Sequence, residues 1–119
     1  LDYEVSLSTK IISYWRIGQG INSMYKSKVN IGKIEKIADQ TGMSLESLIK
    51  ACKFASQYSP EDLDELLNGP FPISWDDDIS DNLSVDPNEV IEIYRGSDSR
   101  KAFRRSIIEV EIDRMRKEI

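Results

Sequence analysis

The chain has 119 residues, a formal net charge of −5, one cysteine and no histidine. This length suits one domain with a hydrophobic core of its own. A single cysteine and the lack of histidine exclude an internal disulfide framework and the usual zinc-binding or nucleophile–base sets, so we expect no enzyme activity, no cofactor and no metal. No apolar run approaches a membrane span, and Cys52 fits a cytoplasmic protein in which it is a small buried hydrophobic residue.

Charge is distributed unevenly along the sequence. Residues 10–53 carry eight basic and three acidic side chains, residues 54–94 carry eleven acidic and no basic ones, and residues 95–119 carry eight basic and five acidic ones. Nucleic-acid affinity depends on local patches rather than on net charge. The basic segment therefore fits a polyanionic partner, provided that the acidic segment faces away from it.

The first predicted helix runs from Ser8 to Tyr25, where apolar residues recur every three or four positions. Gly18 and Gly20 lie inside it and predict a notch where another backbone packs closely. A second helix is expected over Ile31 to Gln40 and a third from Ser44 to Ala55, whose apolar stripe includes Leu45, Leu48, Ile49 and Cys52. Between these two, a left-handed glycine at position 42 would let the chain turn sharply, and the side chain of the serine at position 44 would cap the third helix.

Further along the chain, helix start and stop signals are repeated. "SPEDLDELLNG" and "DPNEVIEIYRG" each combine a capping residue, a proline, early acidic residues and a final glycine, which predicts two short helices. "ISWDDDISDNL" predicts one more short helix beginning near Ser74, and residues 99–119 predict a long one. No segment alternates like a strand. We therefore expect an all-α bundle of about six helices, with a domain over residues 1–97 and a C-terminal helix over 98–119.

The stretch from Ile34 to Ala51 has the spacing of a helix-turn-helix. That motif needs a small residue where its helices cross, a glycine in the turn and aliphatic residues that fix the angle. Counted from Ile34, the fifth, ninth, tenth, fifteenth and eighteenth residues are Ala38, Gly42, Met43, Leu48 and Ala51. A corner between two core helices, without any function, predicts the same pattern. The basic excess over residues 10–53 favours the functional interpretation.

As a helix-turn-helix, this stretch would present a mostly basic and hydroxylated face to duplex DNA. Lysines neutralise phosphates, and serines hydrogen-bond bases or phosphates without strong preference. No arginine, asparagine or glutamine lies on this face to make bidentate base contacts, so modest sequence specificity is expected. The candidate DNA-binding residues are Lys33, Lys36, Ser44, Glu46, Ser47, Lys50 and Lys53.

Four short motifs occur in an order that resembles a known family. They are "YWRIGQGI", the helix-turn-helix run ending in "KFASQYS", "ISWDDDISDNL" and "EIYRG". Together they resemble the helical domain that precedes the nuclease domain in a group of bacterial PD-(D/E)XK-type proteins, and less closely the helical DNA-binding segment of ParB-type partition proteins. The resemblance implies a DNA-binding module of a bacterial or mobile-element protein. Where the first family has "GYGK" this chain has "NIGK", and no nuclease motif is present.

Two other features are expected to be structural. Trp15 and Trp75 lie beside aliphatic residues at helical spacing, which favours core packing over base stacking. Residues 76–78 are three consecutive aspartates, and we expect them to be helix-start acids that face solvent. A calcium loop is disfavoured because Leu83 occupies the position that requires glycine.

The C-terminal segment carries an apolar seam formed by Ile108, Ile112, Met115 and Ile119. The seam predicts a homodimer that pairs two DNA-reading helices. Two alternatives remain: the seam could pack on the chain's own core, or the helix could continue into a further domain. The alternative function, from another class, is a protein-interaction domain whose acidic residues 54–94 meet a basic partner.

Overall fold

The computed structural model describes residues 2–25 and 31–118, with side chains from residue 6 onward. Within these residues the fold is all-α, as predicted, and contains no strand. It comprises helices α1 (Asp2–Met24), α2 (Ile31–Thr41), α3 (Leu45–Gln57), α4 (Pro60–Leu67), α5 (Pro87–Gly96) and α6 (Arg100–Glu118), and a short helical segment made of η1 (Trp75–Ile79), a π turn, and η2 (Ser80–Asn82), a 3-10 turn.

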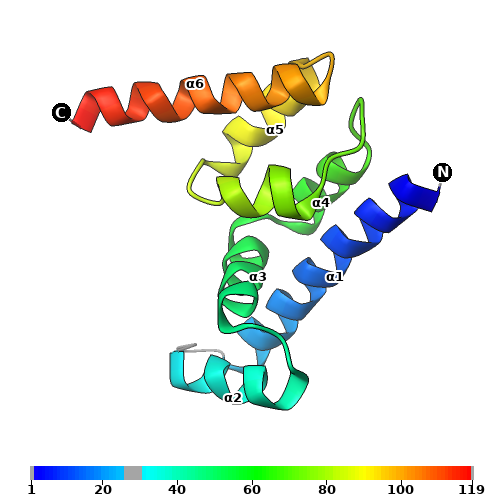
Figure 1. Cartoon of the computed structure of the whole chain (residues 1–119), viewed down its shortest axis with the longest axis vertical. Helices are drawn as coiled ribbons and strands as arrows, with labels where there is room; N and C mark the ends of the chain where they lie inside the picture. The colour runs from blue at the N-terminus through cyan, green and yellow to red at the C-terminus, as the bar shows by residue number, and fades with distance from the viewer. Residues whose placement is uncertain (1, 26–30, 119) are drawn as a thin grey trace.

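The helices form a flat, crescent-shaped molecule of 44 × 41 × 23 Å (Figure 1). Helices α1 and α3 pack against each other in the middle. Helix α2 lies at one end of the molecule. We call α2, α3 and the C-terminal half of α1 the corner lobe. At the other end, α4, η1, η2, α5 and α6 form the large lobe with the N-terminal half of α1. The end of α6 projects from this lobe.

Two hydrophobic clusters of unequal size hold the lobes. The larger one is rich in aromatic residues: the Tyr14 ring stacks on Trp75 at 4.5 Å, and Trp15 Nε1 donates to the Tyr58 carbonyl oxygen at 2.8 Å. The smaller one has only four buried members, namely Ile21, Ile34, Leu48 and Cys52. The prediction that both tryptophans and the cysteine are core residues is confirmed.

The local signals in the sequence set most helix boundaries. Ser59 and Asp62 form a reciprocal capping box at the start of α4, and Asp86 caps α5 by accepting from the backbone nitrogen of Asn88. Ser74 caps the helical turn that was expected there. The first helix is longer than predicted, because it begins at Asp2 rather than Ser8. The glycine after α4 is not its cap: Asn68 ends the helix, and Gly69 leaves room for the Tyr94 ring.

The prediction that all three consecutive aspartates face solvent is wrong for Asp78, whose side chain is fully buried. Its carboxylate accepts from Arg100 Nη2 at 3.1 Å, from Arg104 Nε at 2.9 Å and from the backbone nitrogen of Ser74 at 2.8 Å. The sequence alone did not predict this burial, because the two arginines of α6 that pair with the carboxylate lie more than twenty residues further along the chain. The cluster fastens η1 to α6 inside the large lobe.

Candidate nucleic-acid interface

The predicted corner is present as α2, a short turn and α3. Gly42 has a φ of 75°, the only positive φ among the described residues, and no atom would contact an added Cβ atom there. Its backbone conformation is therefore what requires glycine. Ser44 then caps α3, because its side chain accepts from the backbone nitrogen of Ser47 at 3.1 Å. Leu48 and Ala51, at the fifteenth and eighteenth positions of the motif, are fully buried.

The corner is fastened to α1 by a close helix–helix contact. Gly18 is buried, and a Cβ atom at this position would overlap the carbonyl group of Ala51 in α3. The side chain of Asn22 adds a polar link, since its Nδ2 donates to the Cys52 carbonyl oxygen at 3.0 Å. The predicted notch is thus confirmed at Gly18. It is wrong at Gly20, which is exposed and has open space beside it.

The four predicted lysines differ in how they are held. Lys36 on α2 and Lys53 on α3 are exposed. Lys33 is half-buried, with its Nζ 4.7 Å from the centre of the Tyr25 ring. Lys50 keeps 33% of its side chain exposed and forms an ion pair of 3.2 Å with Glu46. Two of the lysines are therefore exposed, and two are partly held by neighbours.

The hydroxyl and acidic members of the predicted set lie near the start of α3. Ser44 Oγ donates to Ser47 Oγ at 2.8 Å, so both hydroxyls already contribute to the helix start. Glu46 has 79% of its side chain exposed. A carboxylate at this place repels phosphates and leaves base contacts as its only favourable role toward DNA.

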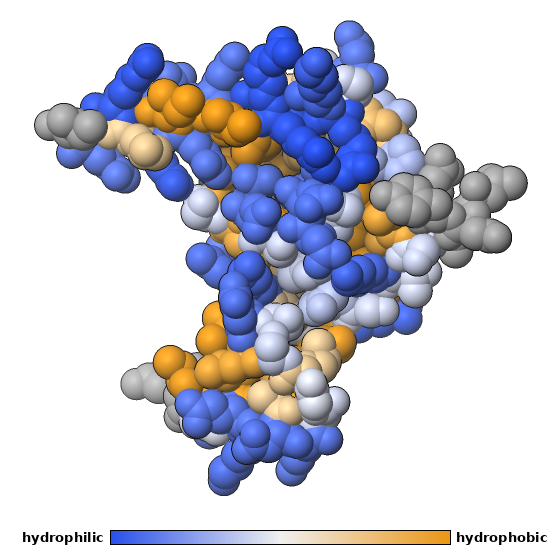
Figure 2. Space-filling model, in the orientation of Figure 1, coloured by the Kyte–Doolittle hydropathy of each residue, from blue (hydrophilic) through white to orange (hydrophobic). Residues whose placement is uncertain are grey.

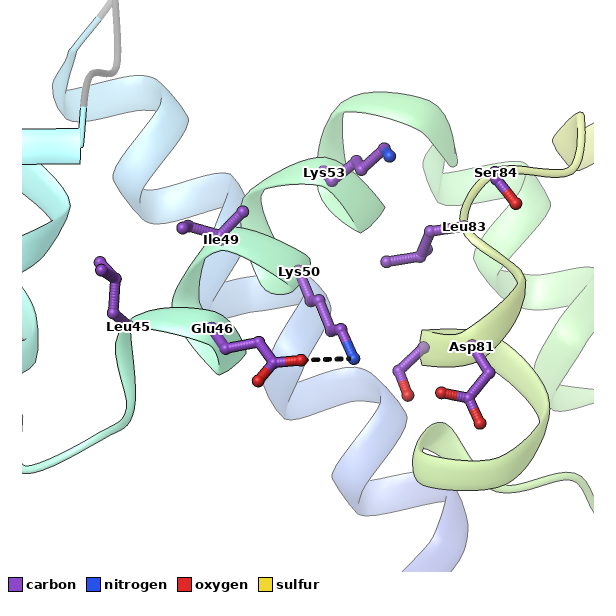
Figure 3. A pocket seen from close by; sticks show the side chains of 9 residues that line it. Leu45, Glu46, Ile49, Lys50, Lys53, Asp81, Leu83 and Ser84 are labelled. Atoms are coloured by element: carbon purple, nitrogen blue, oxygen red, sulfur yellow. Dashed lines mark ion pairs between the residues drawn. The ribbon is translucent and has the colours of Figure 1, made fainter.

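The outer face of α3 forms one wall of a groove of about 450 Å³ (Figure 3). From α3 the groove receives Leu45, Glu46, Ile49, Lys50 and Lys53, and from the opposite wall Ser80, Asp81, Leu83 and Ser84. Aliphatic side chains line both walls together with charged ones. We call this feature the α3 groove.

Sequence reasoning missed the part that aliphatic residues play in this groove. Ile49 was expected on the buried stripe of the third helix, but 38% of it is exposed, and Leu45 is only half-buried. The helical spacing carried a signal, because Leu48 and Cys52 define the buried side and Ile49 lies 100° around the helix from Leu48. Asp81 and Leu83 had no such signal, since only the tertiary fold brings them to α3.

The acidic segment is partly neutralised within the chain. Arg95 Nε donates to Glu65 Oε2 at 2.8 Å, and this hydrogen bond lowers the pKa of Glu65. Lys10 Nζ lies 2.6 Å from Asp76, and Asp78 holds the two arginines of α6. These acids lie near basic side chains from both ends of the chain, so the charge separation along the sequence is smaller in space.

Helix α6 carries an exposed apolar strip beyond its buried part. Phe103 and Ile107 are buried in the large lobe, whereas Ile108, Ile112 and Met115 are 55%, 41% and 58% exposed. Figure 2 shows orange hydrophobic atoms along the projecting α6 and at the edge of the corner lobe, with a hollow between them. These three side chains therefore do not pack on the core. The fourth predicted member of the seam, Ile119, lies outside the described residues.

Other site chemistries find no support in the part of the chain that the structure describes. No group of acidic, cysteine or histidine side chains is arranged to hold a metal ion. Burial raises the pKa of the Cys52 thiol, which disfavours a reactive thiolate. Across residues 2–25 and 31–118, no helix combines the length and the apolar character needed to cross a membrane.

Comparisons of the chain with protein-family models, with curated proteins and with solved structures find no match.

Proposed function

We propose that this chain binds duplex DNA through the corner formed by α2, Gly42 and α3. The observation that carries the proposal is the geometry of the corner: a tight turn at a left-handed glycine, followed by a capped helix whose inner side is buried on α1 and whose outer side lines the α3 groove. This arrangement suits the helix-turn-helix mode, in which the second helix enters the major groove with its first turns toward the bases.

Lys36 and Lys53 would supply phosphate contacts, since both are exposed and lie on the two helices of the corner. Lys33, which lies beside the Tyr25 ring, and Lys50, which is paired with Glu46, would add to the positive potential of this surface. Toward the bases, α3 offers the serines of its first turn and the aliphatic Leu45 and Ile49. Aliphatic side chains contact the thymine methyl group, which provides weaker discrimination than bidentate hydrogen bonds. The proposed binding is therefore of modest specificity and favours A·T pairs.

The proposal includes the expectation, from the resemblance to the helical domain of PD-(D/E)XK-type proteins, that the module belongs to a bacterial or mobile-element protein. The chain itself would not catalyse a reaction. Recognition of the DNA backbone would dominate its affinity, because the face offers lysines for phosphates but no arginine, asparagine or glutamine for bidentate base contacts.

A second function, in protein interaction, is favoured by a different observation. The α3 groove has aliphatic residues on both walls, with Ile49 and Leu45 on one wall and Leu83 on the other. DNA-reading faces are normally polar, whereas apolar clefts with charged rims suit peptide or helix binding. This second proposal moves the interaction surface from the acidic residues 54–94 alone to a groove that α3 shares with them.

The DNA proposal is tested by reversing charge on the corner. We expect Lys36→Glu with Lys53→Glu to weaken binding to a random duplex by about tenfold or more, because about two phosphate contacts become repulsive. Fluorescence anisotropy measures the affinity, and circular dichroism checks that the helical content is unchanged.

The matched control reverses the same amount of charge elsewhere, with Lys101→Glu and Arg105→Glu on the exposed side of α6. We expect this control to bind DNA with a much smaller loss, set by its net charge alone. Equal losses in the two double variants would mean that DNA is not held at the corner, and the proposal would then be wrong.

A further inference from the structure

We propose that the α3 groove binds the exposed apolar strip of α6 from a second copy of the chain, and that two copies exchange these helices reciprocally. The strip consists of Ile108, Ile112 and Met115, and the groove offers the exposed Ile49 and the half-buried Leu45, with the buried Leu83 on its opposite wall. This inference does not depend on DNA binding, because it concerns only the association of the chain with itself.

The spacing of the strip fits helix-in-groove recognition. Its three members stand at positions i, i+4 and i+7, so they form one line along the helix. Seven residues of helix span about 10 Å. The α3 wall of the groove runs from Leu45 to Lys53 and spans about 12 Å by the same rise. The two surfaces are thus of similar length, and both carry aliphatic side chains.

Charged residues beside the groove and beside the strip favour one relative direction of α3 and the α6 helix of a second copy. In α3, Glu46 and Lys53 stand seven residues apart on the groove rim. In α6, Glu109 and Arg116 stand seven residues apart along one edge of the strip. If the two helices run antiparallel, Glu46 lies opposite Arg116 and Lys53 lies opposite Glu109. A parallel arrangement would place like charges together, which is unfavourable.

The strip cannot fill the groove of its own chain. Phe103 and Ile107 hold α6 on the large lobe, and Arg114 Nη1 donates to the Ser84 carbonyl oxygen at 2.9 Å. These contacts fix the side of α6 that faces the core, and the strip lies on the other side, exposed to solvent. A second copy supplies the missing partner, and reciprocal exchange would cover both strips and both grooves at once.

The same exchange would cover the face of α3 that is proposed to meet DNA. Self-association and DNA binding would then exclude each other, so a high concentration of the chain would store it in a form that cannot bind. This consequence distinguishes the exchange from a dimer in which two strips pair directly and leave both α3 helices open.

Two variants of the full chain test the exchange by sedimentation velocity at high micromolar concentration. The strip variant is Ile112→Asp with Met115→Asp, and the groove variant is Ile49→Asp; all three positions are exposed, so both should fold. We expect the unmodified chain to be a dimer and each variant alone to be a monomer. An equimolar mixture should form dimers again, because the intact groove of one variant can receive the intact strip of the other.

Three results would overturn the proposal. A monomeric unmodified chain would assign the strip to another partner, a dimeric groove variant would indicate strip-to-strip pairing, and a mixture no more associated than its components would exclude exchange. A second set of variants does not rely on apolar positions. Glu46→Arg and Arg116→Glu should each weaken the dimer by about tenfold, since both contacts change, and their combination should restore most of the affinity. Failure of the combination to restore it would also contradict the exchange.

Discussion

The two lobes of the crescent are stabilised differently. The large lobe buries a continuous cluster that includes Trp75, Tyr94 and Phe103 and extends to Phe54 and Tyr58 at the end of α3, and it adds the buried carboxylate held by two arginines. The corner lobe has a small cluster of four buried apolar residues and a close helix contact. The difference indicates that the large lobe is the more stable part of the molecule. Few buried residues stabilise the corner lobe, and the outer sides of α2 and α3 do not belong to its core.

Substitution at the contact between α1 and α3 should have the largest effect on the corner lobe. Gly18→Ala places a Cβ atom on the carbonyl group of Ala51, so the two helices must separate. We expect a loss of about 3 kcal/mol in the free energy of unfolding, measured by urea denaturation. Gly20→Ala is the control in the same helix: it meets open space and should stabilise by about 0.5–1 kcal/mol. Equal effects at the two positions would show that the contact is not close.

A smaller loss is expected in the large lobe from removing the charge of Asp78. Asp78→Asn keeps the shape of the side chain but loses the ionised partner of Arg100 and Arg104. Because both arginines still reach solvent in part, we expect a loss of about 2 kcal/mol rather than the larger cost of a fully buried pair. Asp76→Asn, at an exposed neighbour, is the control. A stable Asp78 variant would mean that the aromatic core alone holds α6.

The smallest of the three losses should follow substitution in the turn. Gly42→Val meets no steric obstacle, so its cost is that of a β-branched residue at positive φ, about 1.5 kcal/mol. Gly42→Asn should be tolerated better, because asparagine adopts this conformation more readily. Thermal unfolding would measure both. If valine and asparagine behave alike, the turn does not keep its left-handed geometry in solution.

The fold could be predicted where local chemistry decides it. Ser59, Asp86 and Ser44 set helix starts through contacts with their own neighbours, and Gly42 sets the turn through its own φ. Contacts between distant residues could not be predicted in the same way. Asp78 looked like an acid at a helix start, and only the packing of α6 on η1 shows why it is buried.

For the candidate site, the sequence predicted most of the residues on the outer side of α3. It did not predict the residues that face them across the groove. Lys53 and Glu46 are exposed as expected, whereas Ile49 was assigned to the buried stripe. The opposite wall of the groove comes from residues some thirty positions later, which no local pattern connects to α3. Whether DNA meets this face is a separate prediction that spacing and charge support.

The salt dependence of duplex binding by the unmodified chain tests the central claim most directly. Fluorescence anisotropy on a random duplex, at a protein concentration low enough to avoid self-association, would give the affinity at several salt concentrations. Two to four lysines on the corner should produce a straight line of log affinity against log salt with a slope of about −2 to −4. Absence of binding at low salt, or an affinity that does not change with salt, would contradict DNA binding by the corner of α2 and α3.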